Sequence, residues 1–131
     1  MPVLLVLGCS DPAPAVDYSQ LVVPEARLAS EDARRSGREL YLRHCALCHG
    51  ERADGHGRRR HSLSTPPVDF TRPDWRARTT PKDLFRVVRE GVRGTPMPAW
   101  RVFDDEQTWD LAAYLLAVSE SGPEIGGPPV G

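Results

Sequence analysis

Two cysteines and a histidine form the most informative pattern in the chain. Cys45 and Cys48 lie three positions apart, and His49 follows directly. Residues i and i+3 share one face of a helical turn, so both sulfur atoms could bond to the edge of one flat group while the imidazole binds a metal at its centre. The pattern C-x-x-C-H is the attachment signature of c-type haem. We therefore expect one covalent haem, with thioethers from Cys45 and Cys48 and with His49 as an iron ligand.

Other uses of paired cysteines fit the sequence less well. A thioredoxin-like C-x-x-C site requires a surrounding βαβ unit, and the sequence around the motif does not indicate one. A structural zinc site requires four ligands, usually with a second Cys or His pair, whereas the remaining cysteine is the distant Cys9. A chance occurrence of the pattern is the last alternative. His44, His56 and His61 are ligands in principle, but we expect all three at the surface.

A second pattern offers a ligand for the opposite side of the iron. Met97 is the only methionine after the initiator, and it lies between Pro96 and Pro98. Flanking prolines exclude a helix and stiffen the loop, which is an unusual setting for methionine as core filler. A held thioether suits an axial haem ligand, so we expect Met97 on the iron. Trp100 is expected to wall the haem pocket and to offer its indole N–H to a propionate.

The segment between these two patterns could orient His49. Pro66 and Pro67 fix an extended chain and leave carbonyl groups free to accept hydrogen bonds. A metal-bound histidine usually donates its second ring N–H to a carbonyl or a carboxylate. We expect the carbonyl of Pro66 or Pro67 to be that partner, with simple stiffening of the loop as the alternative.

Three helices are expected to position these groups. Each begins with a residue whose side-chain oxygen can cap free backbone N–H groups, and two of the starts include a capping box. The expected helices are 31–43 after Ser30, 81 to 91–94 after Thr80, and 105–119 after Asp104. Gly37 costs the first helix about 1 kcal/mol relative to alanine, which indicates close approach of another helix. The small Ala112 and Ala113 of the last helix could provide that contact.

The length of the chain and the motifs it lacks limit the class of protein it could be. Its 131 residues suffice for one domain of about 100 residues with flanking segments. The longest apolar run, residues 3–7, is far below the ~20 residues that span a bilayer. The sequence contains neither an evident nucleophile–base pair nor a glycine-rich phosphate cradle. We therefore expect a small carrier, neither an enzyme nor a partner of nucleic acids.

The first nine residues resemble a bacterial lipoprotein signal, cleaved before a cysteine that is then acylated. The run lacks a preceding basic residue and is shorter than usual; an upstream start codon would explain both, and an ordinary N-terminus is the alternative. Proteins with C-x-x-C-H receive haem after export, so we expect a location on the periplasmic side of a bacterial membrane, with a lipid anchor at Cys9. The expected segments are 1–9 signal, 10–29 proline-rich tether, 30–120 folded domain and 121–131 disordered tail.

With these motifs in order, the chain resembles the class I cytochromes c, a family of small mono-haem proteins, over about residues 33–119. The matching residues are Gly37, Tyr41, Cys45, Cys48, His49, residues 67–70, residues 94–98 and Tyr114. The resemblance implies an all-α fold in which the first and last helices cross, with Gly37 against residues 112–114 and with loops around one covalent haem c. It also implies His49 and Met97 as axial ligands, one exposed haem edge and single-electron transfer.

Filled axial positions favour a carrier between redox proteins, because they leave the iron no open position for substrate or oxygen. A bacterial respiratory chain or another periplasmic electron-transfer chain is the expected setting. Two alternatives remain open at this point. The chain could be a haem-bearing subunit of an oxidase or dehydrogenase complex, or it could be a redox or gas sensor in which Met97 is displaced.

Positive charge is concentrated between the two ligand patterns. Residues 52–93 contain 11 basic and 5 acidic residues, including the run Arg58, Arg59 and Arg60 and the later Arg93. We expect some of these arginines to rim the haem edge and to attract an acidic partner surface. The alternative is that the run is an ordinary solvated loop.

Overall fold

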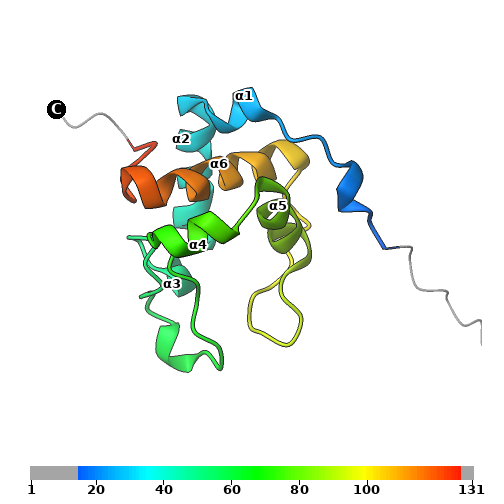
Figure 1. Cartoon of the computed structure of the whole chain (residues 1–131). Helices are drawn as coiled ribbons and strands as arrows, with labels where there is room; N and C mark the ends of the chain where they lie inside the picture. The colour runs from blue at the N-terminus through cyan, green and yellow to red at the C-terminus, as the bar shows by residue number, and fades with distance from the viewer. Residues whose placement is uncertain (1–14, 128–131) are drawn as a thin grey trace, which may run out of the picture.

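The computed structural model describes residues 15–127, and this part of the chain is helical with no β-strand. The helices, in chain order, are α1 (Glu25–Leu28), α2 (Glu31–His44), α3 (Ala46–His49), α4 (Pro73–Arg78), α5 (Pro81–Glu90) and α6 (Asp105–Ser121). Short 3-10 turns lie at Tyr18–Gln20 and Arg60–Ser62. The predicted all-α fold is confirmed. Helices α2 and α6 cross near the centre of the molecule, and the loops that follow α3 and α5 extend to the same end of it (Figure 1).

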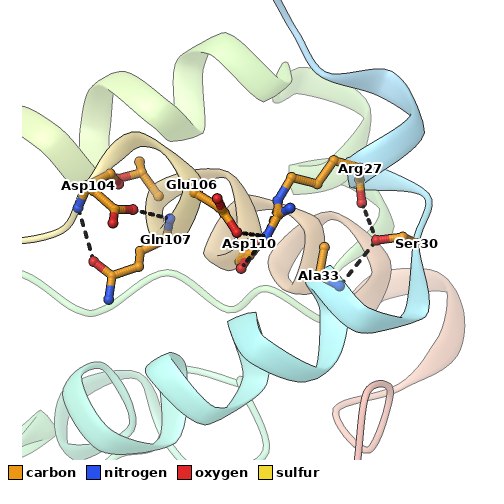
Figure 2. A network of polar contacts seen from close by, with 8 residues as sticks. Arg27, Ser30, Ala33, Asp104, Glu106, Gln107 and Asp110 are labelled. Atoms are coloured by element: carbon orange, nitrogen blue, oxygen red, sulfur yellow. Dashed lines mark hydrogen bonds and ion pairs between the residues drawn. The ribbon is translucent and has the colours of Figure 1, made fainter.

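The three predicted helix starts are observed together with their caps. The Ser30 side chain accepts a hydrogen bond from the backbone N–H three residues later, at 3.1 Å. Asp104 and Gln107 exchange bonds of 2.7 and 3.0 Å at the start of α6 (Figure 2), and Thr80 and Asp83 form the same box at the start of α5. These bonds satisfy backbone donors that the first turn of a helix leaves free. The positions of the long helices were therefore readable from short stretches of sequence.

The close approach predicted at Gly37 is present, but its partner lies partly elsewhere. A Cβ at residue 37 would collide with the backbone carbonyl of Asp110 and would come within 2.9 Å of the Tyr114 Cβ. Ala112 and Ala113 are buried, with 0% and 1% of their surface exposed, yet the nearest atoms belong to Asp110 and Tyr114. The contact of Gly37 with α6 therefore includes Tyr114, within the predicted region 112–114, and extends to Asp110 before it.

Two tyrosines link the helix crossing to the chain on either side of it. Tyr41 of α2 and Tyr114 of α6 are fully buried, with ring centroids 5.2 Å apart. Tyr41 donates its hydroxyl hydrogen to the Gly50 carbonyl at 2.6 Å, and Tyr114 donates to the Pro123 carbonyl at 2.8 Å. Burial raises the pKa of both hydroxyls, that of Tyr114 to about 12. The crossing thereby holds the turn after α3 and the segment after α6.

Residues 17–29 are packed against the helices, which differs from the extended tether expected there. Leu28 is buried, and the Arg27 guanidinium binds both carboxylate oxygens of Asp110 at 2.7 and 3.0 Å and Glu106 at 2.8 Å (Figure 2). A buried carboxylate such as Asp110 requires a partner, and Arg27 supplies it. The Lys82 amine also donates to the Ser19 carbonyl at 2.9 Å. Sequence patterns could not show these contacts, because the partners are 83 and 63 residues apart.

The described part of the C-terminal segment also contacts the helices. Gly126 lies so close to the backbone of Arg34 that a Cβ there would collide with it, and Pro123 accepts the Tyr114 hydrogen bond. Residues 122–127 are therefore not the disordered tail that their composition predicted. The expected signal and its Cys9 lie outside the described residues. Among residues 15–127, no helix has both the length and the apolar character needed to cross a membrane.

Candidate functional site

Cys45 and Cys48 lie on one helical turn at the junction of α2 and α3. The Cys45 N–H donates to the Tyr41 carbonyl at 2.8 Å, and the Cys45 carbonyl accepts from Cys48 and His49 at 3.2 and 2.9 Å. Both cysteines are free thiols and are half-buried. Burial raises the pKa of the Cys45 thiol to about 12, so it remains protonated at neutral pH. The structure thus places Cys45, Cys48 and His49 on one helical turn, as their spacing predicted.

His49 is held in one orientation by its surroundings. Its Nδ1 lies 3.2 Å from the Val68 carbonyl oxygen, and its ring packs on Phe70 with centroids 4.7 Å apart. A carbonyl only accepts hydrogen bonds, so Nδ1 carries the hydrogen and Nε2 keeps a free lone pair. Burial lowers the pKa of His49, against a smaller opposite effect of the Val68 bond. The neutral ring is therefore favoured, and it is the form that binds a metal.

The predicted partner of His49 is wrong by one residue. We expected the carbonyl of Pro66 or Pro67, and the structure shows that of Val68. The Pro67 carbonyl instead lies against Gly55, where a Cβ would come within 2.8 Å of it. Successive groups of an extended chain face opposite sides, so one residue of register decides which carbonyl meets the imidazole. The paired prolines predicted the extended chain but not its register.

The loop after the motif folds back onto the turn, which the sequence did not reveal. The N–H groups of Gly55, Gly57 and Arg59 donate to the carbonyls of His49, Cys48 and Leu47 at 2.8, 3.2 and 3.0 Å. These bonds satisfy carbonyls that the end of a helix leaves free. A Cβ at Gly57 would collide with those of Leu47 and Cys48. Gly55 and Gly57 are therefore required where the loop closes against the turn and the following chain.

The Met97 loop is held by its backbone on both sides of the methionine. The Met97 carbonyl accepts from the Val92 N–H at 3.2 Å, and the Trp100 N–H donates to the Val88 carbonyl at 2.8 Å. Gly91 has φ 70° and lies under the loop, where a Cβ would come within 2.7 Å of the Met97 carbonyl oxygen. The Met97 side chain is half-buried. The loop is thus a firm support for a thioether ligand, as its prolines suggested.

Trp100 and His44 belong to one aromatic cluster. The ring of Trp100 stacks on Phe103 with centroids 5.5 Å apart, and His44 lies 5.4 Å from Trp100 and 5.1 Å from Phe103. The expectation that His44 is a surface residue is therefore wrong, because its ring is packed and half-buried. His56 and His61 are exposed. The contact of the Trp100 indole with a propionate stays a prediction.

The side chains present fit a haem. Two unpaired thiols lie on one turn with a neutral imidazole, and a half-buried thioether lies on a loop at the same end of the molecule (Figure 1). Among residues 15–127, no group of three or more His, Cys, Asp and Glu side chains could hold a metal ion by itself. Two thiols and an imidazole on one turn are the groups that covalent attachment and axial ligation of a c-type haem require.

Comparison with known proteins agrees with this interpretation. Residues 32–115 match the family model described as cytochrome c oxidase, cbb3-type, subunit III. A chain of the Kuenenia stuttgartiensis reducing HAO-like protein complex Kustc0457/Kustc0458 is similar with a TM-score of 0.68 and 25% identity, over 84% of this chain and 52% of that chain. This chain therefore spans about half the length of that structure.

A second similar structure is much closer in size. The KustC0563 c-type cytochrome has a TM-score of 0.51 and 27% identity, over 62% of this chain and 94% of that one. A single-residue variant of the same cytochrome gives a TM-score of 0.51 and 26% identity, over 62% of this chain and 95% of that one. Among curated proteins, none matches the sequence.

Proposed function

The chain belongs to the cytochrome c family described as cbb3-type cytochrome c oxidase subunit III, and on this premise we propose that Cys45 and Cys48 bind the vinyl groups of its haem while His49 binds the iron. The family carries covalent c-type haem, and the protein is an electron-transfer protein of the mono-haem class I type, not an enzyme. The bound haem supplies a one-electron iron couple. The protein side chains attach it, orient it and set its surroundings.

The orientation of His49 is the observation that carries this assignment. The Val68 carbonyl holds Nδ1, so the lone pair of Nε2 is available on the same turn as both thiols. A carbonyl that accepts the second ring N–H in this way sets the tautomer and the basicity of a metal-bound histidine. We assign the sixth ligand to Met97, since its loop is held at Val92 and at Val88.

Mass spectrometry of the denatured protein tests the attachment. The wild-type protein should retain one haem, because thioether bonds survive denaturation, and a Cys45→Ala, Cys48→Ala double variant should retain none. His61→Ala is a matched control, since His61 is an exposed histidine outside the attachment motif. Covalent haem in the double variant would exclude these two cysteines.

We also assign a partner surface to the groove beside the attachment turn. Leu42 and Leu47 are exposed by 38% and 46%, unusually much for leucines, and both line this groove. Leu47 lies between the two thioether cysteines. A partner seated on this groove would therefore lie directly beside the turn to which the haem would be attached.

The charges around the groove indicate what kind of partner fits. Several exposed arginines have no side-chain ion pair or hydrogen bond within residues 15–127. They are Arg43, Arg52, Arg58, Arg59, Arg60, Arg93 and Arg101. Arg43, Arg52 and Arg58 line the groove, together with the acidic Glu51 and Asp54. The Asp54 carboxylate accepts a hydrogen bond from the His56 backbone N–H at 3.0 Å. The net positive rim favours a redox protein with an acidic surface around an apolar contact.

A role as one subunit of a larger redox assembly is a second candidate. It is favoured by the similarity to a chain of an HAO-like protein complex, of which this chain spans about half the length. Purification from detergent-solubilised membranes tests it: stable co-purification with other redox proteins supports the subunit role, and recovery of the cytochrome alone supports a free carrier.

We further propose export to the periplasmic side of a bacterial membrane and a lipid anchor at Cys9. Cys9→Ser should then release the haem protein from the membrane fraction.

A further inference from the structure

The imidazole of His44 lies at the contact between the two halves of the haem site. His44 is the last residue of α2 and directly precedes Cys45. Its ring meets Trp100 at 5.4 Å with an interplanar angle of 59° and Phe103 at 5.1 Å with an angle of 66°. Both aromatic residues follow Met97 along the chain. The cluster therefore joins the segment that attaches the haem to the segment that carries the proposed sixth ligand.

Movement of Trp100 would be transmitted to Met97. The two residues are three positions apart, so the chain between them reaches at most about 10 Å. Pro98 fixes one of the intervening φ angles, and the Trp100 N–H is bonded to the Val88 carbonyl at 2.8 Å. The indole is a rigid side chain at the end of a short, stiff connection. A contact that holds the indole therefore limits how far Met97 can withdraw.

Phe103 makes the support firm. It is buried, with 4% of its surface exposed, and it stacks on Trp100 at an interplanar angle of 8°. His44 packs against both rings, tilted relative to that of Trp100 and T-shaped relative to that of Phe103, and so joins α2 to the loop. The contact is one of ring packing, because no hydrogen bond of the His44 side chain is found within residues 15–127.

We propose that His44 is a positioning residue, whose ring holds the Met97 loop toward the attachment turn and so keeps Met97 on the iron. The proposal rests on the assignment of Met97 as the sixth ligand. A firmly held Met97 would leave the iron no open position, which is expected of an electron carrier and not of a sensor with a displaceable ligand. His44 does this through Trp100 and Phe103, and it does not touch the haem iron.

Competition by an added ligand measures how firmly Met97 is held. An exogenous ligand binds only the fraction of molecules in which Met97 is off the iron, so its apparent affinity reports that fraction. Loss of one aromatic contact should raise the fraction by about two- to tenfold. Imidazole is the probe, titrated into the ferric holoprotein and followed by the visible spectrum of the haem.

Three variants, compared with wild type, separate the possible outcomes, and a fourth serves as a substitute. His44→Ala should bind imidazole about two- to tenfold more tightly than wild type, and His44→Phe should restore the wild-type affinity because it keeps a ring. His61→Ala is the matched control and should match wild type. If His44→Ala matures poorly, Phe103→Leu removes the facing ring from the loop side and should shift the affinity in the same direction. Wild-type affinity in the variant used, or failure of His44→Phe to restore it, overturns the proposal.

A Met97→Ala background distinguishes this proposal from its premise. Met97→Ala alone should bind imidazole most tightly, and adding His44→Ala should then change nothing, because His44 acts only through Met97. A further increase in the double variant would show that His44 acts by general loosening of the pocket and would overturn the positioning role. Wild-type affinity in Met97→Ala would instead remove Met97 from the iron, and both assignments would fall together.

Discussion

The attachment turn and the Met97 loop present ligands to one haem, yet they are held in different ways. The turn is closed by its own neighbourhood: the carbonyls of Leu47, Cys48 and His49 are bonded to N–H groups within the next 12 residues of the chain. The Met97 loop has one backbone bond to α5, from the Trp100 N–H to the Val88 carbonyl, and short-range bonds of its own at Val92 and Thr95. It also packs, through Trp100 and Phe103, against the distant His44 of α2. The difference indicates that the attachment turn is held more by bonds within its own segment, whereas the position of the Met97 loop depends more on contacts with a distant helix.

Such a division has a functional consequence. Covalent attachment requires two thiols in a fixed relation, and a locally closed turn preserves that relation even when the packing of helices changes. The strength of the bond from iron to thioether is a matter of degree, which tertiary contacts can adjust. Each of the following predictions tests part of this comparison between the two regions, beginning with the largest expected effect.

Gly57→Ala should damage the turn far more than Gly94→Ala damages the Met97 loop. A Cβ at Gly57 would collide with backbone carbonyls of the turn, whereas a Cβ at Gly94 meets nothing within 4 Å. Overpacking against rigid backbone costs about 3 kcal/mol or more, and the positive φ of Gly94 costs an alanine only about 1–2 kcal/mol. Denaturant unfolding and the yield of covalent haem measure both variants. Equal losses would contradict local closure of the turn.

Met97→His changes the Met97 loop and not the attachment turn. It should lower the reduction potential while leaving haem attachment intact. Imidazole donates more strongly to ferric iron than a thioether does, so the oxidised state gains relative to the reduced state. Redox titration measures the potential, and the haem should remain low-spin. Met97→Ala should leave attachment intact as well but should open the iron to added ligands. An unchanged potential in the first variant would remove Met97 from the site.

Alkaline pH should weaken the helix crossing on which both regions rest. Burial raises the pKa of Tyr114 to about 12 from an ordinary value of 10.0. Because the folded-state pKa is the higher one, this stabilising contribution is complete below pH 10 and is lost as the pH rises from about 10 to 12. Urea unfolding at pH 9 and at pH 11 should show a smaller loss in Tyr114→Phe than in wild type. An identical loss would exclude Tyr114 as a cause.

Replacing Arg58, Arg59 and Arg60 by Gln should have the smallest effect, one confined to partner association. The triple variant should slow electron transfer with an acidic partner at low salt, and the difference should disappear as salt shortens the screening length to ~8 Å. Arg78→Gln is the matched control, because its charge faces Asp74 at 3.7 Å. Stopped-flow rates against ionic strength measure both variants. A rate in the triple variant equal to wild type at all ionic strengths would leave these arginines as solvated surface.

Much of the candidate site was predictable because its signals are local. The spacing of Cys45, Cys48 and His49 depends on one helical turn, and the caps at Ser30, Thr80 and Asp104 depend on residues three positions apart. The prolines around Met97 act on their immediate neighbours. Such patterns do not depend on the rest of the chain. They therefore correctly predicted the long helices and the placement of the attachment residues on one turn.

The sequence alone determined which side chains can attach and bind a haem, and in what order they occur. Only the tertiary structure decided that Val68 and not Pro67 meets His49, that His44 is packed and not exposed, and that Arg27 joins residues 17–29 to α6. The partners in these contacts are 19, 56 and 83 residues apart. Contacts at such separations form only when helices pack, and one residue of register or one helical turn of offset changes which groups meet.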